Sequence, residues 1–345
     1  MTSYFREYLI EQARAMRPTH RFDEKWVEDF TTWQAQLQDS LKAMLAPWPE
    51  RLELTPQWEL LEKREKYELH RVTYETVPGL LTDALVGIPN DATANTPAVL
   101  CIHGHGRGGS HAVMNYPDRE EVQADIDHYQ YDYGHQFAKA GVIAFAPSLR
   151  GFAQRCDEVE IDASRSKDPC NYNLIQQLAM GEIPLTGQLH DLMCAVDLLC
   201  NMAQVDSKRI GCAGLSYGGR MTMFLAALDH RIKAGVVSGA INSLFERLEN
   251  YASCGYQIIP GMLKVCDFAD ILASIAPRSL CIELGSDDGC CPHEGALKEF
   301  ERIKQAYEVA NAQSALQLVE FEGKHIFDGK TSVPWMLQQL DSKKS

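Results

Sequence analysis

The feature that most constrains the fold is the regular alternation of short apolar runs with longer helix-like stretches after residue 97. The apolar runs do not alternate with polar residues, which is typical of parallel strands buried on both faces. The runs are PAVLCIHG, VIAFAPS, RIGCAGLS, KAGVVSGA, RSLCIELG and LQLVEFE, and the stretches between them include YDYGHQFAKAG, LTGQLHDLMCAVDLLCNM, YGGRMTMFLAALD and HEGALKEFERIKQAYEVAN. The alternation predicts an α/β fold with a doubly wound, mostly parallel sheet.

The first 60 residues follow a different pattern. Between Asp23 and Leu45, apolar residues recur every three or four positions, which indicates a helix with one apolar stripe that needs a partner surface. We therefore expect a helical extension over residues 1–60 that packs on a main domain over residues 61–345. The runs YELHRVTYETV and LLTDALVGI, within 67–89, predict an antiparallel strand pair at the start of the sheet.

Residues 241–275 interrupt the alternation, because they lie between two predicted strands and exceed the length that one crossover helix needs. The segment mixes aromatic residues with cysteine, glycine and proline. We predict that it is a lid, and an ordinary crossover helix with a long loop is the alternative.

The net charge of −14 and the pI near 5.2 limit the partners of the chain. Such a field repels phosphate, which argues against nucleic acid or an anionic membrane as the main partner and favours a neutral or cationic small molecule. The N-terminal residues carry charges every few positions and do not resemble a signal peptide. No apolar run approaches the roughly 18–20 residues that span a bilayer. We expect a soluble, cytoplasmic protein, and a homo-oligomer is compatible with the sequence.

The eleven cysteines are odd in number and mostly lie in apolar segments, where a free thiol behaves as a small hydrophobic group. We expect them to be reduced. The sequence contains no C-x-x-C, so it gives no support for a zinc ribbon or a thioredoxin-like site. We expect neither a metal ion nor a cofactor.

The strongest local signal is GLSYGG at residues 214–219, directly after one apolar run and directly before an amphipathic helix. It matches the G-x-S-x-G nucleophile elbow in the strand–turn–helix context that this motif requires. Flanking glycines let strand and helix approach closely while Ser216 is held in strained geometry, and the helix N-terminus favours negative charge beside it. We assign Ser216 as the nucleophile, and a chance glycine-rich turn is the alternative.

An oxyanion hole must come from a loop after an earlier strand, and CIHGHGRGG at residues 101–109 supplies one. Its glycines allow backbone N–H groups to turn toward a substrate oxygen. We assign the two donors to the backbone N–H groups of His105 and Tyr217. The alternative is a metal site built from His103, His105 and His111, although their spacing matches no familiar zinc pattern.

The base and the acid follow later in the chain. His325 lies just past LQLVEFE, beyond a strand end where ligand-facing residues of open α/β sheets collect, whereas His293 lies near the start of a predicted helix. Asp288 follows RSLCIELG and gives the order Ser, Asp, His of an elbow-type hydrolase. The adjacent Asp287 is the alternative acid. Neighbouring side chains of an extended segment point in opposite directions, so only one of the two can serve.

These motifs resemble those of the α/β-hydrolase superfamily, and within it the dienelactone-hydrolase-like and acetylxylan-esterase-like branch, over roughly residues 65–340. The resemblance rests on HGHG at 103–106, Arg150-Gly151-Phe152, residues 187–191, the elbow, Gly285-Ser286-Asp287-Asp288 with Pro292, and Gly323-Lys324-His325. Similar hydrolases place the acid three residues after the strand-ending glycine and four before a proline, which selects Asp288. Dienelactone hydrolases themselves use cysteine as nucleophile, so Ser216 favours an ordinary ester as substrate.

The resemblance implies the α/β-hydrolase fold and hydrolysis of carboxylic esters with short, acetyl-type acyl groups. We expect Ser216, His325 and Asp288 to act as a catalytic triad through an acyl-enzyme intermediate, with a small-molecule ester as the partner. The same elbow serves thioesterases, amidases and peptidases, and a ligand-binding member without turnover is a further alternative.

Overall fold

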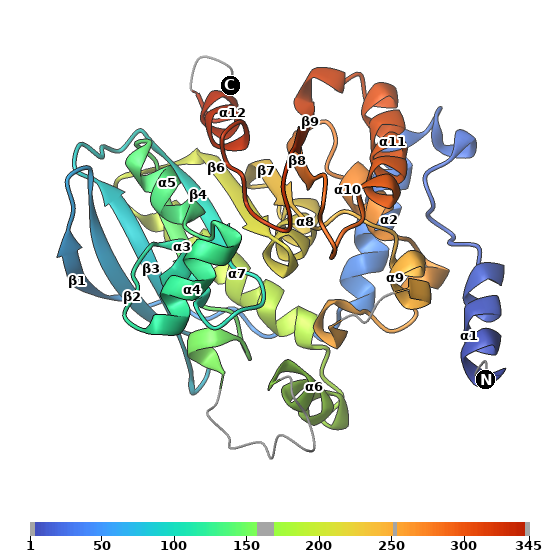
Figure 1. The fold of residues 1–345 in the computed structure, drawn as a ribbon, viewed down its shortest axis with the longest axis horizontal. Helices are drawn as coiled ribbons and strands as arrows, with labels where there is room; N and C mark the ends of the chain where they lie inside the picture. Colours follow the sequence, from blue (N-terminus) through green and yellow to red (C-terminus); the bar gives the residue numbers. More distant parts are fainter. Residues whose placement is uncertain (1–3, 157–168, 251–253, 342–345) are drawn as a thin grey trace.

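The computed structural model describes residues 4–156, 169–250 and 254–341, and its centre is a nine-stranded sheet with helices on both faces (Figure 1). The strand order across the sheet is β1-β2-β3-β5-β4-β6-β7-β8-β9. The bounds are β1 Gln57–Lys63, β2 Tyr67–Val77, β3 Leu80–Pro89, β4 Thr96–Ile102, β5 Ile143–Pro147, β6 Val205–Leu215, β7 Ile232–Ser238, β8 Ser279–Gly285 and β9 Leu316–Phe321.

Strand pairing divides the sheet into two parts. β1, β2 and β3 pair antiparallel in sequence order, and β3 pairs antiparallel with β5. From β5 through β4 and β6 to β9, every neighbouring pair is parallel. The prediction of a mostly parallel, doubly wound sheet that begins with antiparallel strands is confirmed. Because the carboxyl ends of β4, β6, β8 and β9 meet at one edge, the loops that follow them lie together.

Two apolar cores fill the space between the sheet and its helical layers. The helices of these layers are α2 Phe30–Met44, α3 Gly109–Val113, α4 Glu120–Tyr129, α5 Tyr133–Lys139, α7 Pro184–Asn201, α8 Tyr217–Leu228, α10 Phe268–Ala273, α11 His293–Val309 and α12 Ser332–Gln339. Along β4, Ala98, Leu100 and Ile102 face one core and Val99 and Cys101 face the other, as side chains of a strand alternate. The first core includes α2, α7, α8, α10 and α11, and the second includes α3, α4, α5 and α12.

The N-terminal extension joins the first core through one helix. Trp33, Leu37 and Leu41 on α2 are fully buried, in agreement with their helical spacing. In contrast, α1 Tyr4–Ala15 has no buried residue and lies at the edge of the molecule, beside α9 Leu244–Asn250 (Figure 1).

Two details of this region differ from the sequence prediction. The helix expected over 23–45 divides into a short 3₁₀ turn, η1 Glu24–Trp26, and α2. The Asp23 side chain caps the turn, and the Trp26 ring stacks on His20. In addition, β1 begins at Gln57, so the sheet starts inside the span predicted for the helical extension, 1–60.

The segment 241–275 packs partly on the core and partly on α6 Pro169–Ala179. It contains α9, the 3₁₀ turns η3 Gly255–Gln257 and η4 Met262–Lys264, and α10. All six residues of α10 are buried, whereas η3 lies against α6. Residues 251–253 lie outside the described part of the chain, and a lid movement of this segment stays a prediction.

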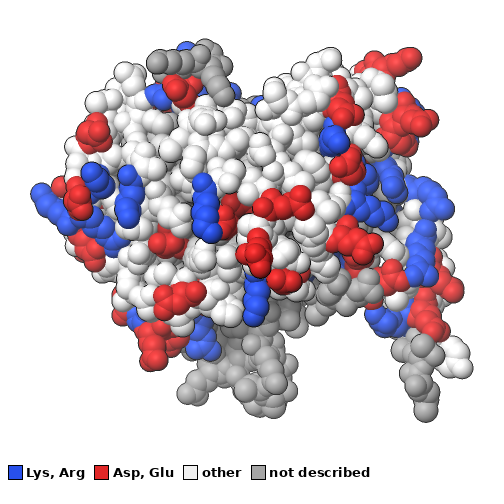
Figure 2. All heavy atoms as spheres, turned by 45° about the horizontal axis from the view of Figure 1, so that its top comes forward, with Lys and Arg blue, Asp and Glu red and all other residues white. Residues whose placement is uncertain are grey.

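The face of the molecule in Figure 2 carries acidic and basic side chains interspersed over most of its area, with a group of basic side chains at its right edge. Within the described ranges, none of the helices is long and apolar enough to span a bilayer.

Candidate active site

Ser216 lies on a tight turn between β6 and α8, with φ 60° and ψ −120°. Positive φ at a non-glycine residue is strained backbone, which is characteristic of a nucleophile elbow. The nearby glycines are sterically required. A Cβ on Gly218 would lie 1.9 Å from the carbonyl oxygen of Ile102, and one on Gly214 would lie 2.4 Å from the Gly218 carbonyl group. The turn presents Ser216 at the carboxyl end of β6, where it lines a cavity.

The imidazole of His325 is oriented by Asp288. Its Nδ1 lies 2.7 Å from Oδ2 of Asp288, whose side chain is 3% exposed. The other carboxylate oxygen, Oδ1, accepts the backbone N–H groups of Cys290 and Cys291 at 2.7 and 2.9 Å. Because the ionised carboxylate only accepts hydrogen bonds, we infer that Nδ1 of His325 carries a proton and that Nε2 is left as an acceptor.

The alternative acid and base lie outside this arrangement. Asp287 is exposed, and its carboxylate accepts the Ser286 hydroxyl at 3.3 Å. His293 has its Nε2 atom 2.7 Å from a carboxylate oxygen of Glu320. In the described structure, neither Asp287 nor His293 lines the cavity that Ser216 and His325 share.

The end of β7 lies against both Ser216 and His325. The backbone N–H of Ser216 donates to the carbonyl oxygen of Ser238 at 2.8 Å. The next residue, Gly239, has a φ of +54°, and a Cβ there would lie 2.9 Å from Cε1 of His325. A glycine at this position is therefore needed both for the backbone conformation and for the imidazole to fit.

The loop after β4 runs against the N-terminus of α8. The backbone N–H of Gly104 donates to the Tyr131 hydroxyl, which donates to the carbonyl oxygen of His105 at 3.2 Å. A Cβ on Gly104 would lie 3.2 Å from the backbone nitrogen of Tyr217. Tyr217 is the first residue of α8, and N–H groups of a first helical turn have no acceptor within the helix. The two N–H groups assigned as oxyanion donors thus come from neighbouring segments beside Ser216.

The three histidines of this loop do not converge on one point. His103 is fully buried and its Nε2 accepts the Leu149 N–H at 3.0 Å, while burial lowers the pKa of His103 to about 4. His111 lies 3.0 Å from a carboxylate oxygen of Asp118. Among the described residues, the clusters of His, Cys, Asp and Glu that are close enough to hold a metal ion include His105 but neither His103 nor His111. The three-histidine alternative therefore has no geometric support.

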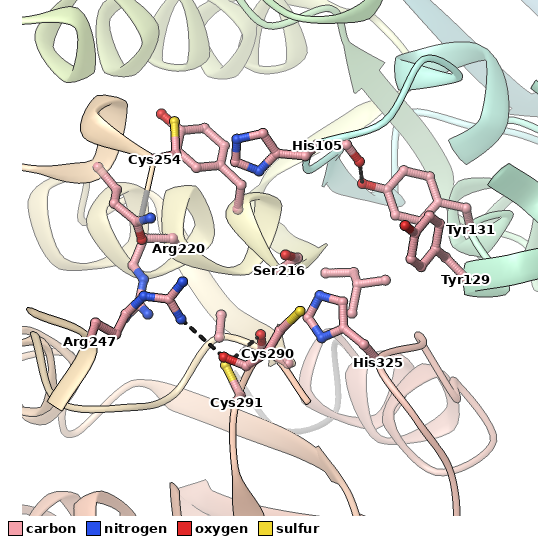
Figure 3. Close-up of a pocket in the computed structure, with 15 residues that line it drawn as sticks. His105, Tyr129, Tyr131, Ser216, Arg220, Arg247, Cys254, Cys290, Cys291 and His325 are labelled. Carbon is pink, nitrogen blue, oxygen red and sulfur yellow. Dashed lines mark hydrogen bonds between the residues drawn. The ribbon is translucent and has the colours of Figure 1, made fainter. Parts of the chain in front are cut away.

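Ser216 lies in a cavity of about 480 Å³, between His105 on one side and His325 on the other (Figure 3). Most of its wall comes from residues that the sequence did not mark as functional. These are Tyr129, Tyr131, Leu215, Arg220, Gly239, Ala240, Arg247, Cys254, Gln257, Cys290 and Cys291.

Two arginines give the cavity a positive wall in a chain of net charge −14. Arg220 is buried on α8, donates to Oδ1 of Asn242 at 2.7 Å and lies 3.6 Å above the Phe268 ring. Burial lowers the pKa of Arg220 to about 9, so it stays protonated at neutral pH. Arg247 donates to the carbonyl oxygen of Cys290 at 3.0 Å. Within the described ranges, no Asp or Glu lines this cavity.

A buried ion-pair network connects the loop after β5 to the site. Asp191 on α7 accepts from Arg150 at 2.6 and 2.7 Å and from Arg155 at 2.7 Å. Burial alone would raise the pKa of Asp191, but the hydrogen bonds and charges of the two arginines lower it. The carbonyl oxygen of Arg150 accepts from Gln188 at 2.7 Å, and the Gln188 side chain accepts the Tyr217 hydroxyl. Arg150 and Asp191 belong to two separate segments that carry the family resemblance, and in the structure they form an ion pair.

Comparison with known proteins agrees with this fold. A family model described as an abhydrolase family matches residues 6–331. The "Putative hydrolase YtaP" of Bacillus subtilis (strain 168) is 24% identical over 301 residues, which are 85% of this chain and 94% of that protein. Among solved structures, a "putative acetyl xylan esterase" from Bacteroides fragilis NCTC 9343 has a TM-score of 0.82 at 20% identity and covers 98% of this chain and 95% of that chain. A glucuronoyl esterase from Solibacter usitatus has a TM-score of 0.65 at 17% identity and covers 92% of this chain and 94% of that chain.

Proposed function

Because the chain belongs to the abhydrolase family, and so to the α/β-hydrolases, we propose that it is a serine-dependent hydrolase of carboxylic esters with short acyl groups. One observation carries this proposal. Ser216, on a strained turn, shares a cavity with His325, whose Nδ1 lies 2.7 Å from the Asp288 carboxylate. This is the arrangement that nucleophilic catalysis by a hydroxyl group needs, since the hydroxyl requires a base and the base requires a fixed tautomer.

In the proposed reaction, Oγ of Ser216 attacks the ester carbonyl while Nε2 of His325 removes its proton. Asp288 keeps the imidazole in the required tautomer and stabilises the imidazolium that forms. The N–H groups of His105 and Tyr217 hold the oxyanion of the tetrahedral intermediate. His325 then protonates the leaving alcohol, and a water molecule activated by the same base releases the acyl group from Ser216.

The cavity wall supports a polar alcohol part of the ester. Arg220 and Arg247 both line the cavity, and a guanidinium group presents several N–H donors in fixed directions. Such donors suit the hydroxyl and ring oxygens of a carbohydrate. The names of the similar structures, an acetyl xylan esterase and a glucuronoyl esterase, are consistent with cleavage of esters on carbohydrates.

A panel of p-nitrophenyl esters of increasing acyl length, measured beside acetylated sugars, tests the proposal. We expect kcat/KM to be highest for the acetyl ester and to fall at least about tenfold, or ~1.4 kcal/mol, for the octanoyl ester. Acetate release from the sugars should depend on Ser216 and be lost in Ser216→Ala. Faster cleavage of a matched thioester or anilide than of the ester would instead favour a thioesterase or an amidase of the same fold.

A further inference from the structure

A second cluster of reactive side chains lies in the wall of the active-site cavity. One imidazole nitrogen of His105 and the Sγ atoms of Cys170 and Cys254 all lie within 4.8 Å of one another. The three residues come from different parts of the chain: the loop after β4, the first turn of α6, and the position before η3. The two sulfur atoms are 3.3 Å apart, and the Cys170 side chain is buried.

Aromatic rings surround this cluster. The His105 ring contacts Phe152 and Tyr217 with centroid distances of 5.0 and 5.2 Å, and Tyr256 packs on Phe152 at 5.3 Å. Within the described structure, Nε2 of His105 is buried and has no hydrogen bond of normal geometry, and the His105 side chain interacts with the thiol of Cys254. A buried polar atom without a partner costs free energy and calls for an explanation such as an ion that is not present.

We propose that His105, Cys170 and Cys254 bind a thiophilic divalent cation, with Zn²⁺ as the ion that this donor set favours. Two thiolates and one imidazole are ligands of tetrahedral zinc, and three protein ligands leave a fourth position for water or another small ligand. His105 and Cys254 line the same cavity as Ser216, so an ion that they bind would lie in the wall of that cavity. The ligands are far apart in the sequence, which is why no local motif marks the site.

The sulfur separation favours a metal ion over a disulfide bond. Zn–S bonds of about 2.3 Å in a tetrahedron put two sulfur atoms about 3.8 Å apart, whereas a disulfide needs about 2.05 Å. The two sulfur atoms are 3.3 Å apart, so they need to separate by about 0.5 Å to bind the ion. To form a disulfide bond they would need to approach each other by more than twice that distance.

Bound zinc has a direct consequence for the reaction. The ion connects the oxyanion loop to α6 and to the segment 241–275, and it occupies the cavity wall beside Ser216. We therefore expect zinc to inhibit the esterase reversibly, and a chelator to restore the rate. This inhibition rests on the proposed function, whereas metal binding itself does not.

Metal binding is measured on the full chain after reduction and removal of metals. Titration with Co²⁺ reports the coordination through its absorption spectrum, and displacement by Zn²⁺ followed by metal analysis gives the stoichiometry. We expect one ion per chain, sulfur-to-cobalt charge-transfer absorption and the visible bands of a tetrahedral site.

Serine variants locate the ion. Cys170→Ser and Cys254→Ser each remove one thiolate with little change in volume, and each should weaken Zn²⁺ binding by about 100-fold or more. Cys290→Ser is the matched control, because Cys290 forms with Asp288 and His325 the other described cluster that is close enough to hold an ion. The control should keep the affinity and the cobalt spectrum of the wild type.

The outcomes separate the proposals. Loss of the cobalt spectrum in both Cys170→Ser and Cys254→Ser, with retention in Cys290→Ser, supports the site. Retention in both variants, loss in Cys290→Ser alone, or no binding by the reduced wild type overturns it. Equal inhibition of the wild type and Cys170→Ser by Zn²⁺ would overturn the inhibitory role. A wild type that binds cobalt but cleaves no ester would refute the proposed function and leave the metal site standing.

Discussion

Replacing Asp191 with asparagine tests whether the buried ion-pair network supports the frame of the active site. The Asp191 side chain is 3% exposed and accepts hydrogen bonds from both nitrogens of the Arg150 fork and from Arg155. The guanidinium-bearing side chains are 19% and 9% exposed. Asparagine keeps one acceptor oxygen, but it removes the negative charge and turns an amide NH₂ group toward a guanidinium. Two largely buried cations then lose their carboxylate partner.

Removing one partner of a buried ion pair costs about 3–5 kcal/mol, which is roughly a 150- to 5000-fold change in the unfolding equilibrium constant. Asp197→Asn is the matched control, because Asp197 lies on the same helix and also contacts two arginines, Arg51 and Arg231, but its side chain is 31% exposed. An ion pair with that exposure contributes about 0–1 kcal/mol. Equilibrium urea unfolding, followed by tryptophan fluorescence and circular dichroism, measures both variants.

The difference between the wild type and Asp191→Asn should also depend on pH. The pKa of Asp191 is lowered in the folded chain. Its contribution to stability is therefore complete above the unfolded-state pKa of about 3.9 and is lost as the pH falls through the lower folded-state pKa. Equal destabilisation by Asp191→Asn and Asp197→Asn at neutral pH would refute the reasoning, because the burial of the first pair would then have no energetic effect.

Three further sets of variants address the reacting groups. Asp288→Asn should lower kcat by about 10⁴-fold, because asparagine presents the wrong hydrogen-bond partner to His325. Asp287→Asn should change kcat little and lower only the stability. The reverse ranking of the two variants on the same ester would contradict the choice of Asp288 as the acid. His325→Ala should remove nearly all activity, whereas His105→Ala should retain much of it because the backbone N–H of residue 105 is unchanged. Similar losses in the two variants would argue against the assignment of the residue 105 backbone N–H as an oxyanion donor. Gly239→Ala should lower kcat, because a Cβ there would lie 2.9 Å from Cε1 of His325. Full activity of this variant would show that the His325 imidazole can move to make room for the Cβ.

The strands that carry the site are predictable from the sequence because they are buried on both faces. An uninterrupted apolar run such as RIGCAGLS has few other ways to bury its side chains, and it coincides with the end of β6. β1 shows why other strands are missed. Its sequence QWELLEK lies at the edge of the sheet and is almost entirely exposed, and its apolar residues Trp58 and Leu60 are too few to form a long apolar run. Its pairing with β2 stabilises it instead.

The reacting residues of the candidate site are predictable for a topological reason. Parallel strands end at one edge of the sheet, so a serine after β6, an aspartate after β8 and a histidine after β9 are brought together without any knowledge of side-chain contacts. The cavity wall is not predictable in this way. Arg220 lies within a helix that is otherwise mostly apolar, and Arg247 and Cys254 belong to a segment whose path over the site no local pattern determines.

The central claim, that Ser216 is the nucleophile of an acyl-transfer reaction, is tested most directly by covalent labelling. A fluorophosphonate reacts with an activated serine, and peptide mass spectrometry identifies the modified residue. We predict that the wild type gains one phosphonyl group on Ser216 and loses activity. Ser216→Ala should not be labelled, and its kcat on p-nitrophenyl acetate should be lower by about 10⁴-fold or more. Labelling of a different residue, or retention of most activity by Ser216→Ala, would contradict the claim.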